Sequence, residues 1–207
     1  MKRTPVATVT LALLRTPVLY PLRDALLSAG FAMAASYAHG DNMGNQASLD
    51  DQVLLLRDAE KKLPPLRAVD LVGFSMGGLD ALMEASRHMV TGLSAVVVLS
   101  GMCDQIPFLG SVMGKSIVSA FGGKTGEALL EAIGPYDPAK QDPRSYSGYK
   151  YWFWQSPTDH TVPPVQAASM TAILESARVP VQLSLLDGNH GDLSKLQPQQ
   201  IVQYFQS

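Results

Sequence analysis

Short apolar runs alternate with amphipathic stretches along almost the whole chain. Each apolar run has the length of a β-strand, and most are followed by a segment whose apolar residues recur at helical spacing. This alternation is typical of a parallel sheet covered by helices on both faces. The runs that we interpret as strands cover residues 6–14, 31–37, 68–73, 94–100, 149–155 and 181–186.

The intervening patterns predict helices, and one of them has a recognisable start signal. Ser48 precedes a helical pattern as the expected N-cap, and Asp51 three residues later approximates a capping box. The predicted helices cover residues 20–29, 49–63, 76–88, 165–177 and 198–205. We therefore expect one α/β domain over residues 1–207, with a mostly parallel six-stranded sheet.

Residues 102–147 interrupt the alternation. They contain many glycines and prolines and two short helical patterns, 106–121 and 126–133, but no convincing strand. We interpret this segment as a helical insertion between two strands and as a candidate lid. Its apolar first half either covers a pocket or packs against the sheet, and the pattern alone favours neither.

Composition excludes several classes of function. The chain is 46% hydrophobic and 16% charged, with a formal net charge of -2 and no basic cluster, so we expect no nucleic-acid partner. The single Cys103 excludes an internal disulfide, and the four histidines are too widely spread for a zinc motif. We expect no metal and no cofactor.

The N-terminus resembles the start of a secretory signal, because two basic residues precede the apolar stretch 6–14. However, no small-residue cleavage site follows, and threonines alternate with apolar residues as in a strand. No run reaches the length needed to cross a bilayer. We therefore expect a cytoplasmic protein rather than a secreted one.

The most informative motif is Gly-Phe-Ser-Met-Gly at residues 73–77, between a predicted strand and a predicted helix. A sharp strand-to-helix turn exposes a serine hydroxyl for attack on a carbonyl carbon, so Ser75 is a candidate nucleophile. The alternative is a structural turn whose serine caps the helix. Other residues are needed to decide between them.

Two loops supply candidate partners for Ser75. Asp159 follows one predicted strand and His190 follows the last, and the chain order of serine, acid and histidine is the one expected for this turn. A histidine takes the serine proton, and a carboxylate orients that histidine. The alternatives that remain open are His39 for the base and Asp187 or Asp192 for the acid, whereas His88 and His160 are expected at a helix end and at a rim.

With these three motifs the chain resembles the α/β-hydrolase family. The resemblance rests on residues 73–78, 158–163 and 188–191, and residues 36–45 resemble a loop of its esterase-like members. It implies that Ser75, Asp159 and His190 are the nucleophile, the acid and the base of ester hydrolysis through an acyl-enzyme. Family members usually begin with an antiparallel pair of strands, so the resemblance also implies a trimmed N-terminal edge.

The oxyanion hole is the weakest part of this resemblance. The Met76 amide is the expected first donor, and a second donor is expected from Arg15 or Thr16. The loop there is shorter than in the family, and Pro17 has no N–H to donate.

We expect a carboxylesterase or lipase-like serine hydrolase that acts on a small to medium apolar ester. The alternative is a hydrolase-like scaffold that binds a small molecule with little turnover, and a homodimer formed through the exposed sheet edge is compatible with the sequence. The residues expected to bind substrate are Phe74, Phe108, Leu109, Met113 and Trp154.

Overall fold

A computed structural model describes residues 4–9, 17–63 and 66–207. One sheet with the strand order β2-β1-β3-β4-β5-β6 forms its centre, and every neighbouring pair of strands is parallel. The strands are β1 (Thr4–Val9), β2 (Ala32–Ala34), β3 (Leu66–Phe74), β4 (Leu93–Leu99), β5 (Lys150–Gln155) and β6 (Val181–Leu185).

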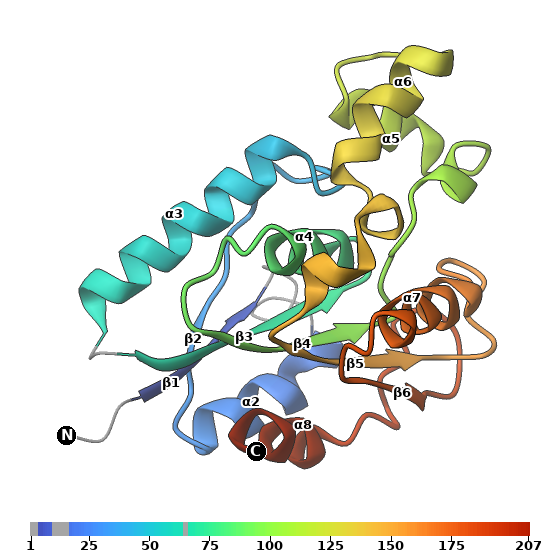
Figure 1. The fold of residues 1–207 in the computed structure, drawn as a ribbon. Coiled ribbons are helices and arrows are strands. Elements are labelled where there is room, and N and C mark those ends of the chain that lie inside the picture. Colours follow the sequence, from blue (N-terminus) through green and yellow to red (C-terminus); the bar gives the residue numbers. More distant parts are fainter. Residues whose placement is uncertain (1–3, 10–16, 64–65) are drawn as a thin grey trace.

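Helices cover both faces of this sheet (Figure 1). Helices α2 and α8 pack on one face, while α4 and α7 pack on the other with α3 beside them. The helices are α2 (Tyr20–Ser28), α3 (Gln46–Lys62), α4 (Gly77–Ser86), α5 (Gly114–Ala120), α6 (Gly126–Ile133), α7 (Val165–Ser176) and α8 (Pro198–Gln206).

Two cores form because successive strand residues point to opposite faces. In β4, Val97 and Leu99 pack with α2 and α8, whereas Val96 and Val98 pack with α4 and α7. This alternation explains why the central strands are apolar at nearly every position.

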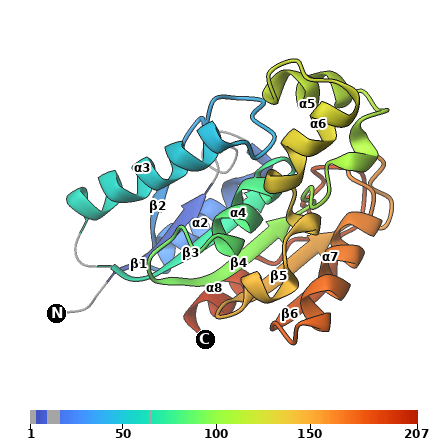
Figure 2. The ribbon, with the colours of Figure 1, turned by 45° about the horizontal axis from the view of Figure 1, so that its top comes forward.

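The insertion between β4 and β5 contains no strand, as predicted, and its helices stand above the carboxyl ends of the strands (Figures 1 and 2). The predicted helix 126–133 is confirmed as α6. The predicted helix 106–121 is wrong as one element, because it divides into a short 3-10 turn at Ile106–Phe108 and α5. Pro107 starts the 3-10 turn, and residues 109–113 then form turns and a bend before α5 begins. A Cβ on Gly114 would lie 2.2 Å from the Leu109 carbonyl oxygen, so this turn requires glycine there.

Two predicted boundaries are also corrected. The strand predicted at 31–37 ends at Ala34, because the chain then turns and Ala38 and His39 have positive φ angles of 46° and 63°. The N-cap of α3 is Asn45 and not Ser48, since the Asn45 side chain accepts a hydrogen bond from the Ser48 N–H at 3.1 Å. Of the strand predicted at 6–14, residues 10–14 lie outside the described residues.

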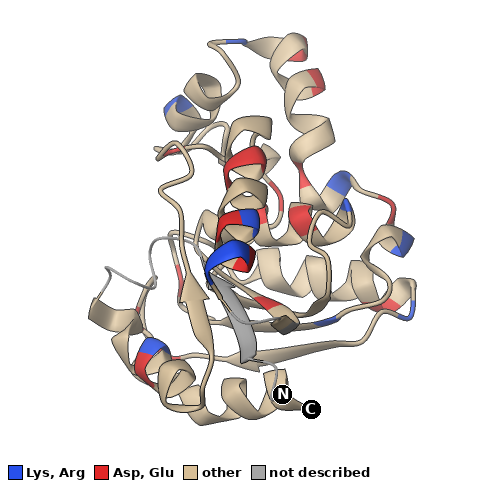
Figure 3. Ribbon diagram, turned by 90° about the vertical axis from the view of Figure 1, so that its left-hand side faces the viewer, with Lys and Arg blue, Asp and Glu red and all other residues tan. Residues whose placement is uncertain are grey.

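The described helices include none that is both long and apolar enough to cross a membrane. Lysines and arginines are interspersed with acidic residues over the ribbon, and α3 carries both signs along its length (Figure 3).

Asp70 in β3 makes the stability of the fold depend on pH. Its side chain is fully buried, and neither carboxylate oxygen has a hydrogen-bond partner among the described residues. Burial raises its pKa from 3.8 to about 7, against the opposing effect of the Lys150 charge. The folded state therefore favours the protonated form, and stability falls as the pH rises from about 4 through about 7.

Asp70→Asn should remove this dependence. Relative to wild type, the variant should gain about 3 kcal/mol of unfolding free energy between pH 5 and pH 8, which urea unfolding at the two pH values measures. Asp50→Asn on the exposed side of α3 is the matched control and should gain nothing. A gain for Asp70→Asn that is equal at both pH values contradicts a protonated native Asp70.

Candidate active site

Ser75 lies in the turn between β3 and α4, in a conformation that few residues other than glycine adopt. Its φ angle is 53°, which costs about 1 kcal/mol or more for a residue with a Cβ. Its N–H donates to the Leu99 carbonyl, and its own carbonyl accepts from Gly78 and Met102 at 3.0 Å each. These backbone hydrogen bonds hold the strained turn, so the Ser75 hydroxyl is not needed to stabilise it.

The glycines of the motif are required by close backbone approach. A Cβ on Gly73 would lie 2.4 Å from the Gly77 carbonyl oxygen, and one on Gly78 would lie 3.0 Å from the Gly101 Cα. Both contacts are to backbone, which cannot move aside cheaply. The sequence of the turn is therefore set by the packing of β3 on α4.

The structure brings Ser75, His190 and Asp159 together at the carboxyl ends of β3, β6 and β5. His190 Nε2 lies 2.9 Å from Ser75 Oγ, and His190 Nδ1 lies 2.8 Å from Asp159 Oδ2. Because a carboxylate only accepts, Nδ1–H donates to Asp159, and Nε2 is then the acceptor for the Ser75 hydroxyl. This tautomer is the one that a general base needs.

Asp159 is held so that it points at His190. Its side chain is completely buried, and its Oδ1 accepts from the backbone N–H groups of Thr161 at 2.9 Å and Val162 at 2.8 Å. Gln155 donates to Oδ2 at 3.2 Å, on the oxygen that also faces His190. These donors fix the orientation of the buried Asp159 side chain.

Phe74 orients the imidazole from another side. Its ring stacks on His190, with ring centroids 5.6 Å apart and planes inclined by 21°. The His190 side chain is 18% exposed, so its ring lies at the edge of solvent while the Asp159 side chain is shielded from solvent.

The two alternative candidates for the acid, Asp187 and Asp192, form their side-chain contacts with residues other than His190. Asp187 pairs with Lys195 at 3.2 Å, and Asp192 accepts from the Ser194 hydroxyl at 2.6 Å and its N–H at 3.1 Å. Neither contacts His190, so they shape its loop rather than orient its ring.

The alternative histidines also lie apart from Ser75. His39 Nε2 pairs with Asp51 at 3.3 Å, and His88 Nδ1 lies 2.7 Å from the Tyr149 hydroxyl at the end of α4. His160 is exposed. The described residues contain no group of three or more histidine, cysteine or acidic side chains placed to hold a metal ion.

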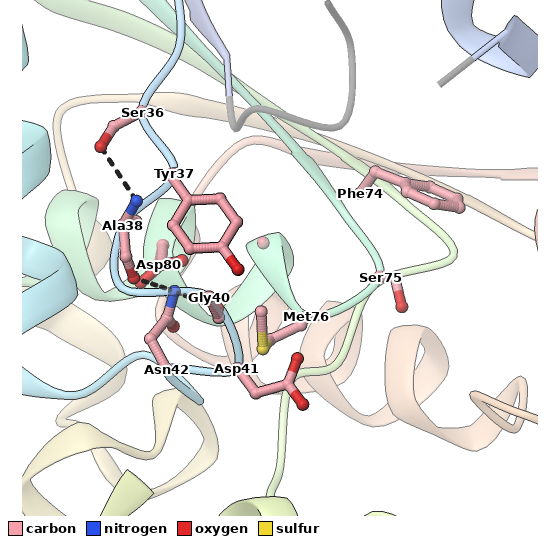
Figure 4. A pocket seen from close by; sticks show the side chains of 11 residues that line it. Ser36, Tyr37, Ala38, Gly40, Asp41, Asn42, Phe74, Ser75, Met76 and Asp80 are labelled. Carbon is pink, nitrogen blue, oxygen red and sulfur yellow. Dashed lines mark hydrogen bonds between the residues drawn. The ribbon is translucent and has the colours of Figure 1, made fainter. Parts of the chain in front are cut away.

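A cavity of about 340 Å³ adjoins Ser75 (Figure 4). One wall is the loop after β2, and the other is the turn around Ser75 with the first part of α4. Tyr37, Asp41 and Met76 surround a common space, with Ser75 beside it. Its described lining consists of Ser36, Tyr37, Ala38, Gly40, Asp41, Asn42, residues 74–77 and Asp80.

The predicted substrate-binding residues do not all meet here. Phe74 lines the cavity, but Phe108, Leu109 and Met113 do not. They belong to an apolar cluster that α5 and α6 form with Leu79, and Met76 of the cavity lining packs against this cluster. Trp154 is buried under α2 and α8 with its ring 4.9 Å from that of Trp152, so its assignment to the pocket is wrong. The insertion has an apolar core of its own, and Phe108, Leu109 and Met113 pack in that core rather than around the cavity.

The cavity-lining residues to which sequence reasoning assigned no substrate role include Tyr37, Asp41 and Asp80. The loop 36–45 had been singled out by its resemblance, but no substrate role was assigned to it. Asp80 had a usable signal, because it places a charge one turn into a helix that is otherwise buried and largely apolar.

For the oxyanion hole, the structure describes one of the three predicted donors. Met76 lies at the N-terminal end of α4, and its N–H donates to no other group in the described part of the chain. An N–H at a helix start points away from the helix body and is available to an anion. Arg15 and Thr16 lie outside the described residues.

No protein-family model and no curated protein matches the sequence. Solved structures do match. An acetyl ester-xyloside bifunctional hydrolase from Caldicellulosiruptor lactoaceticus is 18% identical over 99% of this chain and 83% of its own, with a TM-score of 0.73. A lipase/esterase from Lactobacillus plantarum is 13% identical over 100% and 86%, with a TM-score of 0.72.

A peptidase shares the fold as part of a longer chain. An acylaminoacyl peptidase from Pyrococcus horikoshii is 13% identical over 99% of this chain and 36% of its own, with a TM-score of 0.72. Identities this low show a common fold and leave the activity open. The chain adopts the α/β-hydrolase fold.

Proposed function

We propose that this protein is a serine hydrolase that cleaves carboxylic esters through an acyl-enzyme, with Ser75 as nucleophile. The observation that carries the proposal is the continuous hydrogen-bonded line from Asp159 through His190 to Ser75, with distances of 2.8 and 2.9 Å. Packing of the core does not require this arrangement, which combines a buried carboxylate, an imidazole in the matching tautomer and a serine on a strained turn.

The mechanism follows from these positions. His190 Nε2 takes the Ser75 proton as Oγ attacks the ester carbonyl, and Asp159 stabilises the imidazolium that forms. The Met76 N–H stabilises the negative oxygen of the tetrahedral intermediate. The alcohol leaves with the proton from His190, and water activated by the same ring then releases the acid.

The dimensions of the cavity support a small substrate. A volume of about 340 Å³ is at the low end of the range for small-molecule sites, and it accommodates a short acyl or alcohol portion. Phe74 and Met76 supply apolar contact beside Ser75.

We also propose that the insertion over residues 102–147 acts as a cap on this site. Two hydrogen bonds support this, because both join α5 to the loop after β2 that lines the cavity. The Ser116 hydroxyl donates to Asp41 at 3.3 Å, and the Asn45 side chain donates to the Ala120 carbonyl at 2.9 Å.

Covalent labelling with a fluorophosphonate tests the function. Wild-type protein should be labelled at Ser75 and lose its hydrolysis of p-nitrophenyl acetate, because phosphonylation blocks the nucleophile. Ser75→Ala should take no label, and the matched control Ser176→Ala, which changes an exposed serine at the end of α7, should label as wild type does. Absence of labelling in wild type would favour the binding scaffold instead.

A further inference from the structure

The lining of the cavity beside Ser75 includes two acidic residues from different elements. Asp41 is exposed on the loop after β2, and Asp80 is 1% exposed on α4. The described lining residues include no lysine, arginine or histidine. Two negative side chains therefore share one concave, partly water-excluded surface, which strengthens their effect on a bound charge.

The Asn42 side chain, which also lines the cavity, is already engaged within the protein. Asn42 uses its side-chain amide on the carbonyls of Ala38 at 2.7 Å and Gly40 at 3.2 Å, and its oxygen accepts from Gly44. Its N–H groups hold the loop in shape and leave little donor capacity for a ligand. The hydroxyls of Ser36 and Tyr37 in the lining can both donate and accept, so the charged groups that the described lining offers to a ligand are the two acidic side chains.

Asp80 is fixed in place and does not swing away. Its Oδ1 accepts from the Ser48 hydroxyl of α3 at 2.6 Å, a buried contact between two helices. Burial raises the pKa of Asp80 to about 6, against the opposing effects of the Ser48 hydroxyl and the neighbouring Asn42 side chain. Above neutral pH the carboxylate is therefore ionised in a site that penalises an unbalanced charge.

Glu84, one turn further along α4, is buried near Asp80. It is 3% exposed, its Oε2 has no partner among the described residues, and burial and the nearby Asp80 raise its pKa. A raised pKa favours the neutral, protonated carboxyl, so Glu84 adds no charge to the site, and the charge that a bound cation would balance is that of Asp41 and Asp80.

We propose that the cavity receives a positively charged, ammonium-bearing portion of the ester substrate, with Asp41 and Asp80 as its specificity-determining residues. The inference rests on the proposed function, because it assigns the substrate class of the same site. A neutral polyol would also donate hydrogen bonds, but it would leave the two like charges uncompensated. An anionic portion would be repelled by both.

Matched esters test this without assuming which side of the ester enters the cavity. One set varies the alcohol: dimethylaminoethyl acetate, its neutral isostere isopentyl acetate, and the acetate ester of β-hydroxypropionate. The other varies the acid: methyl γ-dimethylaminobutyrate, methyl isoheptanoate and monomethyl glutarate. Each set keeps its shape and changes only the charge from positive through neutral to negative.

The readout is kcat/KM by acid release at pH 8. In at least one set, kcat/KM for the cationic ester should be about tenfold higher than for the neutral ester and higher still relative to the anionic ester. This is the size expected for one charge pair in a partly dehydrated site. Because the comparison is a ratio within one enzyme, differences in the amount of folded protein cancel. The charged substituents also change the intrinsic reactivity of the esters, so each kcat/KM is divided by the rate constant for hydroxide-catalysed hydrolysis of the same ester before the ratios are taken.

Variants assign the effect to the two residues. Asp41→Asn and Asp80→Asn should each lower the cationic-to-neutral ratio severalfold, whereas Asp50→Asn removes an exposed charge outside the cavity and should leave that ratio as in wild type. If Asp80→Asn fails to fold, the exposed Asp41→Asn and the wild-type ratios still decide the question.

The outcomes separate the two proposals. Equal normalised kcat/KM for the three charges in both sets overturns the substrate class while ester hydrolysis stands. A ratio that falls equally in Asp50→Asn overturns the assignment to the cavity. If wild type hydrolyses none of the esters and none of p-nitrophenyl acetate, the proposed function fails and the substrate class fails with it.

Discussion

Replacement of Ser75 by alanine should lower kcat for ester hydrolysis by about a millionfold, the loss found when the nucleophile of a serine hydrolase triad is removed. The reason is geometric, since the His190 Nε2 that lies 2.9 Å from Ser75 Oγ would have no hydroxyl to activate. Steady-state hydrolysis of p-nitrophenyl acetate measures it. Ser176→Ala, with its exposed hydroxyl away from the cavity, should retain wild-type kcat.

A second variant of Ser75 should lose activity but gain stability, because it relieves the strain at this position. Ser75→Gly should be as inactive as Ser75→Ala, but it should raise the unfolding free energy by about 1 kcal/mol, because glycine adopts a φ of 53° without steric cost. Thermal unfolding compares the two variants. A Ser75→Gly variant that is less stable than Ser75→Ala would mean that the turn stores no such strain.

The second large effect is expected at the acid. Asp159→Asn should lower kcat by about ten thousandfold, the size known for the same change in the triad of another serine hydrolase. An amide in place of Asp159 Oδ2 can donate to His190 Nδ1, and the ring would then present an N–H to Ser75 instead of an acceptor. The loss should fall on kcat, and KM should stay close to its wild-type value.

Two other acidic residues provide the comparison for this variant. Asp187→Asn and Asp192→Asn should keep most of the activity, because their carboxylates contact Lys195 and Ser194 rather than His190. Near-normal kcat in Asp159→Asn together with a large loss in one of these two would transfer the role of the acid.

The three residues at the centre of the site were predictable because each lies where a strand ends. The order of strands and turns follows from apolar runs and glycines, and parallel strands bring their carboxyl ends to one edge of the sheet. Ser75, Asp159 and His190 therefore meet although 115 residues separate the first from the last. Some local requirements can also be read directly from the sequence. A close backbone contact at residue 73, for example, requires the glycine that is found there.

The pocket was less predictable because burial competes with substrate binding for the same residue types. An apolar residue in the insertion, such as Phe108, serves equally well in a small core, and periodicity does not distinguish the two uses. The N-cap of α3 was predicted at Ser48, but the helix begins three residues earlier and its N-cap is Asn45. The acidic lining at Asp41 and Asp80 arises from a contact between distant elements.

The central claim is that Ser75 forms a covalent acyl-enzyme. Wild-type protein mixed rapidly with p-nitrophenyl acetate, quenched in acid and digested should carry one acetyl group on the peptide that contains Ser75, formed with the first turnover of p-nitrophenol release. The same peptide from Ser75→Ala should carry none. An acetyl group on any other residue, or hydrolysis by wild type with no acetylated peptide at any quench time, would contradict the account.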